Sequence, residues 1–138
     1  MEQKDYFLRE IEKIGSLLKA IISKISRNKD ETSIKIDNQF DETKNELIDS
    51  FNFNLLEFIN MNNDEAISYL ENKTGFNLVN IELLSRILEE LGLNDNSDRK
   101  YALLKKSLLI IEYCKSKDKT FSFEREEKIQ RLNSSIQG

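Results

Sequence analysis

The chain has 138 residues, one third of them charged, and a net charge of −4. That length is enough to bury a hydrophobic core without disulfide bonds. The sequence contains no histidine, and Cys114 is its only cysteine. These counts exclude Ser-His-Asp and Cys-His catalytic sites, and they leave too few ligands for a structural zinc site. They also exclude an internal disulfide, which is typical of a protein from a reducing compartment.

The first ten residues carry charges where a secretory signal peptide has an apolar core. The longest aliphatic run, Leu108 to Ile111, is far shorter than the about 20 residues that cross a bilayer. We therefore expect a cytoplasmic protein without a membrane segment. The absence of proline favours long helices joined by short polar turns. No segment alternates polar and apolar residues, so we predict an all-α protein without a β-sheet.

The first predicted helix covers residues 4–26 and carries a heptad seam with Gly15 beside its middle. The seam residues are Phe7, Ile11, Ile14, Leu18, Ile21 and Ile25. Because glycine costs about 1 kcal/mol relative to alanine inside a helix, we expect another helix to approach closely at Gly15. The seam packs either on the rest of the chain or on a second copy. We favour internal packing, because Leu8 and Ile22 widen the apolar face beyond a two-stranded seam.

Three more helices are predicted in the middle of the chain. A long one covers residues 37–60. A short one follows the start signal at residues 62–65 and stops at Thr74 and Gly75. The next follows Asn77 and is expected to end at Gly92, a residue that readily forms a left-handed cap.

Two helices complete the prediction. One covers residues 98–115 and is expected to bury Tyr101, Leu104, Leu108 and Ile111. The other begins near Ser122 and is expected to bury Phe123, Ile129, Leu132 and Ile136. The whole chain, residues 1–138, is thus predicted to be one domain, a bundle of about five to six antiparallel helices.

Charge is unevenly distributed along the sequence. Residues 37–95 hold 13 acidic and 3 basic residues, whereas residues 1–36 hold 8 basic and 6 acidic and residues 96–138 hold 10 basic and 6 acidic. We expect the acidic middle to pair with the more basic ends. A basic patch for phosphates is conceivable at Arg99, Lys100, Lys105 and Lys106. Because the pI is about 5.1 and no reading motif is present, we do not expect nucleic-acid binding.

The remaining candidate sites have simpler structural interpretations. Glu42, Glu46 and Asp49 share a helix face and offer oxygen ligands for Mg²⁺ or Ca²⁺, but an exposed acidic face is far more common. Residues 94–98 lack the glycine and glutamate of a calcium loop. Lysines after Cys114 would favour a thiolate, but its apolar helix favours a core cysteine. We therefore predict no catalytic residue, no cofactor and no metal site.

Residues 3–15, QKDYFLREIEKIG, are similar to the opening of a family of short uncharacterised bacterial proteins, with the pattern QKDYxLRxIExIG. Residues 119–129, KTFSFEREEKI, resemble the closing helix of the same family. This family is a domain of unknown function. The resemblance implies a compact unit and brings no activity, cofactor or catalytic residue with it.

A second resemblance concerns the C-terminal half, residues 77–136. Two groups of residues resemble the paired helices of a tetratricopeptide repeat: Ile81, Leu84, Ser85 and Leu88, and then Leu104, Ser107 and Leu108. The loop LNDNSD is about three residues longer than in the repeat, and Lys100 stands where the repeat has alanine. The resemblance implies a tetratricopeptide-like helical hairpin and not an array of repeats.

The leading hypothesis for function is a non-enzymatic helical protein that binds an unidentified protein partner, since helical bundles offer grooves for helices and extended segments. One alternative is a homodimer with a structural role, formed through the first helix. Less supported alternatives are a nucleic-acid binder that uses the basic patch and an enzyme that depends on carboxylates or a metal.

Overall fold

The computed structural model describes residues 2–28 and 38–138. Within these ranges the regular structure is entirely helical, which confirms the all-α prediction. The helices are α1 (Glu2–Asn28), α3 (Gln39–Phe51), α4 (Leu55–Ile59), α5 (Asn63–Glu71), α6 (Leu78–Asn94), α7 (Arg99–Lys117) and α8 (Phe123–Gln137). They outnumber the predicted five to six because one predicted helix is split in two.

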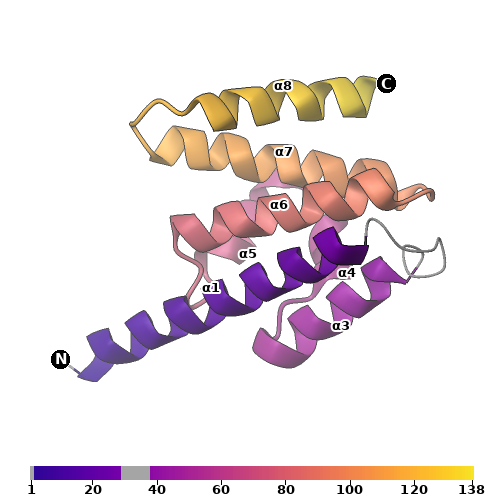
Figure 1. The fold of residues 1–138 in the computed structure, drawn as a ribbon. Helices are drawn as coiled ribbons and strands as arrows, with labels where there is room; N and C mark the ends of the chain where they lie inside the picture. Colours follow the sequence, from indigo (N-terminus) through magenta and orange to yellow (C-terminus); the bar gives the residue numbers. More distant parts are fainter. Residues whose placement is uncertain (1, 29–37) are drawn as a thin grey trace.

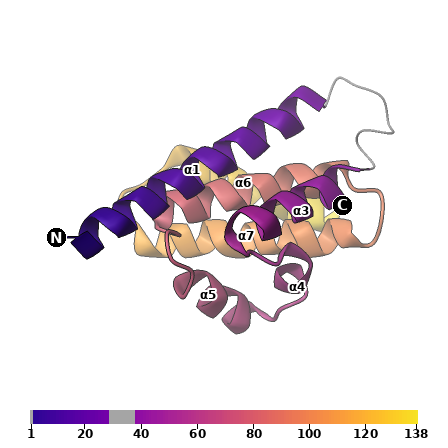
Figure 2. The ribbon, with the colours of Figure 1, turned by 90° about the horizontal axis from the view of Figure 1, so that it is seen from below.

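Four helices, α1, α6, α7 and α8, lie side by side in a row (Figure 1). α4 and α5 cover one face of this row, and α3 lies near α1 (Figure 2). Short loops make α6–α7 and α7–α8 antiparallel, as expected for a bundle. α1 and α6 instead run in the same direction (Figure 1), which the antiparallel prediction missed. The parallel pair is possible because α3, α4 and α5 intervene in the chain and carry it back across the molecule.

The helices bury two apolar clusters. The larger one joins α1 and α3 to α7. It includes Leu18, Leu47, Leu84 and Ile110, all of which are fully buried. The smaller one holds α8 on α7 and is centred on three buried residues, Leu104, Ile111 and Leu132. α8 is therefore attached through a small contact of its own rather than through the main core.

The predicted helix over residues 37–60 is wrong in one respect, because it breaks between Phe51 and Leu55. Its expected start, Asp37, lies outside the described residues. Asn52 ends α3 in a left-handed conformation with φ of 55°, which asparagine tolerates better than most residues. The break turns Phe53 inward, where its ring is fully buried and lies 5.2 Å from that of Phe58. Burial of this aromatic side chain favours the break over a continuous helix.

Two glycines lie inside helices where a neighbour comes close. A Cβ atom on Gly15 of α1 would lie 2.9 Å from Oδ1 of Asn80 in α6, so the expected close approach at Gly15 is present. The prediction that Gly92 caps its helix is wrong, because α6 continues to Asn94. A Cβ atom on Gly92 would lie 2.8 Å from the side chain of Leu104 in α7. The small size of Gly92, and not its backbone freedom, explains its position.

Two buried polar contacts fix the positions of the helices. The side-chain amide of Asn80 donates to the backbone carbonyls of Ile11 (2.9 Å) and Gly75 (2.7 Å), and so joins α1 to the turn before α6. Ser85 of α6 and Ser107 of α7 each donate to the other's backbone carbonyl, at 2.9 and 2.7 Å. These serines satisfy each other in the core and hold the α6–α7 hairpin at close range.

The prediction that Tyr101 and Phe123 lie in the core is wrong. Their exposed fractions are 44% and 74%. α7 lies between α6 and α8 and buries two faces, with Leu103 in the main core and Leu104 in the α8 cluster, so no single stripe through Tyr101 is covered. Phe123 is the first residue of α8 and contacts the ring of Phe121, which is itself exposed.

Among the helices of the described residues, none combines the length and the apolarity that crossing a membrane requires. The ion pairs between helices follow the uneven charge of the sequence. Lys24 of α1 pairs with Glu46 of α3 at 2.8 Å, and Arg125 of α8 pairs with Glu82 of α6 at 2.8 Å. The acidic middle of the chain thus packs between more basic helices.

Candidate functional site

The predicted seam of α1 divides into a covered part and an uncovered part. Four seam residues are buried: Ile14, Leu18, Ile21 and Ile25. Gly15 is buried too and faces Asn80 of α6. Ile11 is half-buried, and Phe7 is 47% exposed. Most of the seam therefore belongs to the core, but its first two turns do not.

The uncovered part lies at the N-terminal end of α1, which extends past the ends of the other helices (Figure 1). We call Tyr6, Phe7 and Leu8 the α1 tip. All three are about half exposed, and the rings of Tyr6 and Phe7 lie 5.8 Å apart. Sequence reasoning named Phe7 but not Tyr6 as a seam residue, because Tyr6 lies off the heptad spacing. Three consecutive large apolar residues near a helix start are the signal that would have identified the tip.

The four predicted basic-patch residues do not form one surface. Arg99 donates to Asp95 at 3.1 Å, and its guanidinium lies 4.0 Å from the centre of the Phe40 ring. Lys106 is buried, and burial lowers its pKa, with the charge of Lys105 adding to the effect. Lys100 is half-buried and Lys105 exposed. Arg99 is thus engaged by Asp95 and Phe40, and Lys106 is buried in the fold. Lys100 and Lys105 alone are too few cations for a phosphate-binding stripe.

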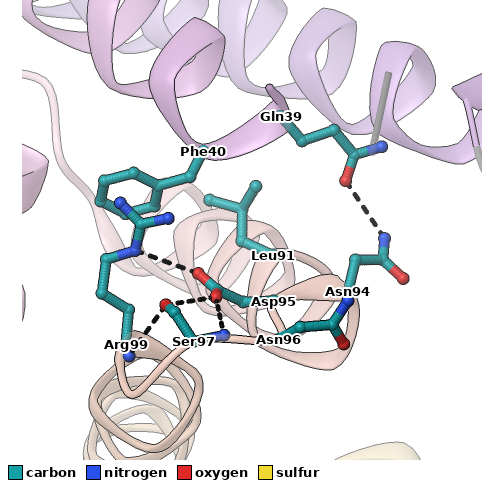
Figure 3. A pocket seen from close by; sticks show the side chains of 8 residues that line it. All are labelled: Gln39, Phe40, Leu91, Asn94, Asp95, Asn96, Ser97 and Arg99. Atoms are coloured by element: carbon teal, nitrogen blue, oxygen red, sulfur yellow. Dashed lines mark hydrogen bonds and ion pairs between the residues drawn. The ribbon is translucent and has the colours of Figure 1, made fainter. Parts of the chain in front are cut away.

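A polar pocket of about 330 Å³ lies where α3 meets the α6–α7 loop (Figure 3). Asp95 is central to it and accepts hydrogen bonds from the backbone N–H of Ser97 (2.7 Å), the hydroxyl of Ser97 (2.6 Å) and Nε of Arg99. Burial opposes ionisation of Asp95, but these hydrogen bonds and the Arg99 charge outweigh it and lower the pKa. The carboxylate is thus already used to shape the loop.

The upper wall of the same pocket is made by Gln39. Its side-chain oxygen accepts from Nδ2 of Asn94 at 3.1 Å, and its amide nitrogen is buried without a hydrogen-bond partner among the described residues. That nitrogen points away from the pocket (Figure 3). The pocket therefore presents few free polar groups, and its residues explain the loop geometry better than the binding of a small molecule.

A second charged cluster joins α8 to α6. Arg125 donates to both carboxylate oxygens of Glu82, at 3.1 and 2.8 Å, and to Asp118 at 2.8 Å. Arg131 donates in the same two-pronged way to Glu89, at 2.8 and 3.1 Å. Sequence reasoning missed both pairs, because partners 43 and 42 positions apart leave no local signal. The forked geometry gives this contact direction as well as attraction.

Two titratable groups lie beneath this cluster. Burial lowers the pKa of Lys128 to about 8, although Glu89 opposes the shift and lies 3.9 Å away. Burial raises the pKa of the Cys114 thiol to about 12, and nearby Glu82 adds to this effect. Cys114 is fully buried, so the downstream lysines do not make it a reactive thiolate, and it is a core residue.

No group of three cysteine, aspartate or glutamate side chains in the described ranges is arranged to hold a metal ion. Two of the three acids considered for a cation site contact Lys24 instead: Glu46 at 2.8 Å and Glu42 at 3.8 Å. Comparison of the chain with models of protein families, with curated proteins and with solved structures finds no match in any of the three.

Proposed function

We propose that this protein acts by binding another protein rather than by catalysis, and that the α1 tip is the surface it presents. The observation that carries the proposal is the exposure of Tyr6, Phe7 and Leu8 on consecutive positions of a projecting helix end. Large apolar side chains gathered on an exposed surface are a common mark of an interaction site. The absence of histidine and the burial of Cys114 argue against nucleophilic catalysis.

The tip is suited to a partner because it continues the buried seam. Phe7 lies one heptad before Ile14, which is buried in the core, so the same apolar stripe runs from the core onto the free end. A partner that covers Phe7 and Leu8 would extend the core by two turns. Aromatic side chains at such positions often contribute most of the binding energy of an interface.

Capture from a lysate of the source organism tests this proposal. The bait is the whole chain, compared with Phe7→Glu. Ser16→Glu is the matched control, because Ser16 is exposed on the same helix and gains the same charge. We expect a specific protein to be retained by the wild type and by Ser16→Glu and lost with Phe7→Glu. Equal retention by all three baits would contradict the proposal.

A second candidate function is self-association through the same tip. Two α1 helices that cross antiparallel at Leu8 would bring Lys4 of one copy near Glu12 of the other, twice by symmetry, because both residues are four positions from Leu8. Light scattering after size exclusion distinguishes the candidates. A mass of 16.2 kDa at every concentration favours a foreign partner, and a dimer that Phe7→Glu dissociates favours self-association.

We also propose a cytoplasmic location, supported by the single buried cysteine. The likeness to short bacterial proteins of unknown function and the tetratricopeptide-like character of the α6–α7 hairpin are likewise proposals. The second is supported by the reciprocal Ser85–Ser107 hydrogen bonds, which allow the two helices to approach closely.

A further inference from the structure

A groove of about 810 Å³ runs between α1 and α6, away from the α1 tip. We call it the α1–α6 groove. Its floor is apolar and is made by Ile22 of α1 and Leu83 of α6. Its rims carry Lys19 and Arg27 from α1 and Arg86 from α6. Among the described residues, none of those that line this groove is acidic.

Unlike the cations that bridge helices elsewhere in the molecule, the three cations of the groove form no ion pair within the described residues. Lys24, Arg125 and Arg131 each contact a carboxylate of another helix at 2.8 Å. Within the described residues, the cations of the groove have no acidic partner within 4.0 Å. The chain has more acidic than basic residues, 25 against 21, so three neighbouring cations without partners are unexpected.

The other side of α6 shows how this helix receives a neighbour of opposite charge. There Glu82 and Glu89 are bound by two arginines of α8, beside an apolar contact between α7 and α8. On the α1 side the charged residues that line the groove are basic, although Arg86 also borders the hollow that holds Glu82 and Glu89. The complementary occupant is a helix with an apolar stripe flanked by carboxylates.

We propose that the α1–α6 groove binds an acidic amphipathic helix of another protein. Lys19 and Arg27 are eight residues apart on α1, about 12 Å along the helix axis. Glutamates two turns apart on a bound helix match this separation, and leucines between them contact Ile22 and Leu83. Arg86 contacts the acidic flank from the opposite rim. A purely ionic ligand would leave the apolar floor unused.

The test is a titration of the full chain with a fluorescent helical peptide of roughly 18 residues, with glutamates beside one leucine stripe. We expect saturable binding that weakens as salt rises. The double variant Lys19→Glu, Arg27→Glu is expected to weaken it about tenfold or more. The control Lys105→Glu, Lys119→Glu makes the same change of charge at two exposed lysines elsewhere and is expected to bind as the wild type does.

A second peptide, with every glutamate replaced by lysine, is expected not to bind. Circular dichroism melting of each variant verifies that the fold is intact. Three results would overturn the proposal: no binding of the acidic peptide, equal binding by the groove variant, or preferential binding of phosphatidylglycerol vesicles or an RNA oligonucleotide. Phe7→Glu separates this site from the α1 tip, because it is expected to leave peptide binding unchanged.

Discussion

The two sides of α6 hold their neighbours in different ways. Toward α8, its carboxylates at Glu82 and Glu89 are each bound by an arginine, and the apolar contact behind them is small. Toward α1, the contact is apolar and close, with Gly15 against Asn80 and Leu18 fully buried. Charge contributes to the attachment of α8, whereas burial holds α1. Among the described residues, Lys19, Arg27 and Arg86 beside this contact have no carboxylate partner.

The largest effect is expected on the α1 side, from Leu18→Asp. Leu18 is fully buried in the main core, and an unpaired carboxylate there costs about 4 kcal/mol or more of unfolding free energy. We expect the fold to be lost, as measured by circular dichroism melting. Ser16→Asp, on the exposed face of the same helix, serves as the control. A folded Leu18→Asp monomer would show that the seam is an interface and not a core.

On the α8 side the expected effect is smaller. Arg125→Ala removes the forked pair with Glu82 and the contact with Asp118, and leaves both acids without this partner. We expect the free energy of unfolding to fall by about 2 kcal/mol, because the guanidinium is nearly buried. Urea denaturation measures it, with Lys105→Ala as the control. A change of a few tenths of a kcal/mol would show that the apolar cluster alone holds α8.

The buried Lys128 gives the α8 side a dependence on pH. The folded protein loses the Lys128 proton near pH 8, whereas the unfolded chain keeps it to about pH 10.4. Between these values the folded state binds fewer protons, so the free energy of unfolding rises with pH. From pH 7 to 8.5 we expect Lys128 to contribute a rise of about 0.8 kcal/mol.

Cys114 opposes this rise by about 0.4 kcal/mol at the top of the window, because its raised pKa keeps the folded thiol protonated while the unfolded thiol, with a pKa of about 8.5, is half ionised there. Urea denaturation across the window measures the rise. Lys128→Met is expected to abolish it and to leave stability at pH 7 unchanged or higher. The same rise in Lys128→Met would assign it to another group.

The smallest effect is expected from Arg27→Ala, which tests whether a cation on the α1 side of α6 contributes to stability. Arg27 has no acidic partner among the described residues, so we expect the free energy of unfolding to change by less than about 0.5 kcal/mol. Urea denaturation alongside Arg125→Ala gives a direct comparison of two arginines on the two sides of α6. A loss as large as that of Arg125→Ala would mean that Arg27 is structural and not available to a ligand.

The sequence predicted those features that depend on neighbours along the chain. The cap of α5 is an example, because Asn62 and Glu65 satisfy each other's backbone N–H groups within one turn. Ser122 caps α8 in the expected place. The seam from Ile14 to Ile25 was also evident, since helical spacing puts these residues on one face whatever covers them.

The candidate surfaces were predicted only in part. Phe7 was named as a seam residue, but the sequence does not say where the covering helices end and so does not say that Phe7 is exposed. Lys19, Arg27 and Arg86 were not singled out. Arg86 lies about 60 positions from the other two, and only the parallel packing of α1 on α6 brings it to the same groove.

The sequence by itself thus determined the helices, most of their caps and the apolar stripe of α1. The tertiary structure decided the break at Asn52, the place of Gly92 inside α6, the exposure of Phe123 and the pairing of Arg125 with Glu82. The physical reason is range. Backbone hydrogen bonds and caps act within about four residues, whereas burial and ion pairing depend on which helices meet, and segments far apart in the chain determine that.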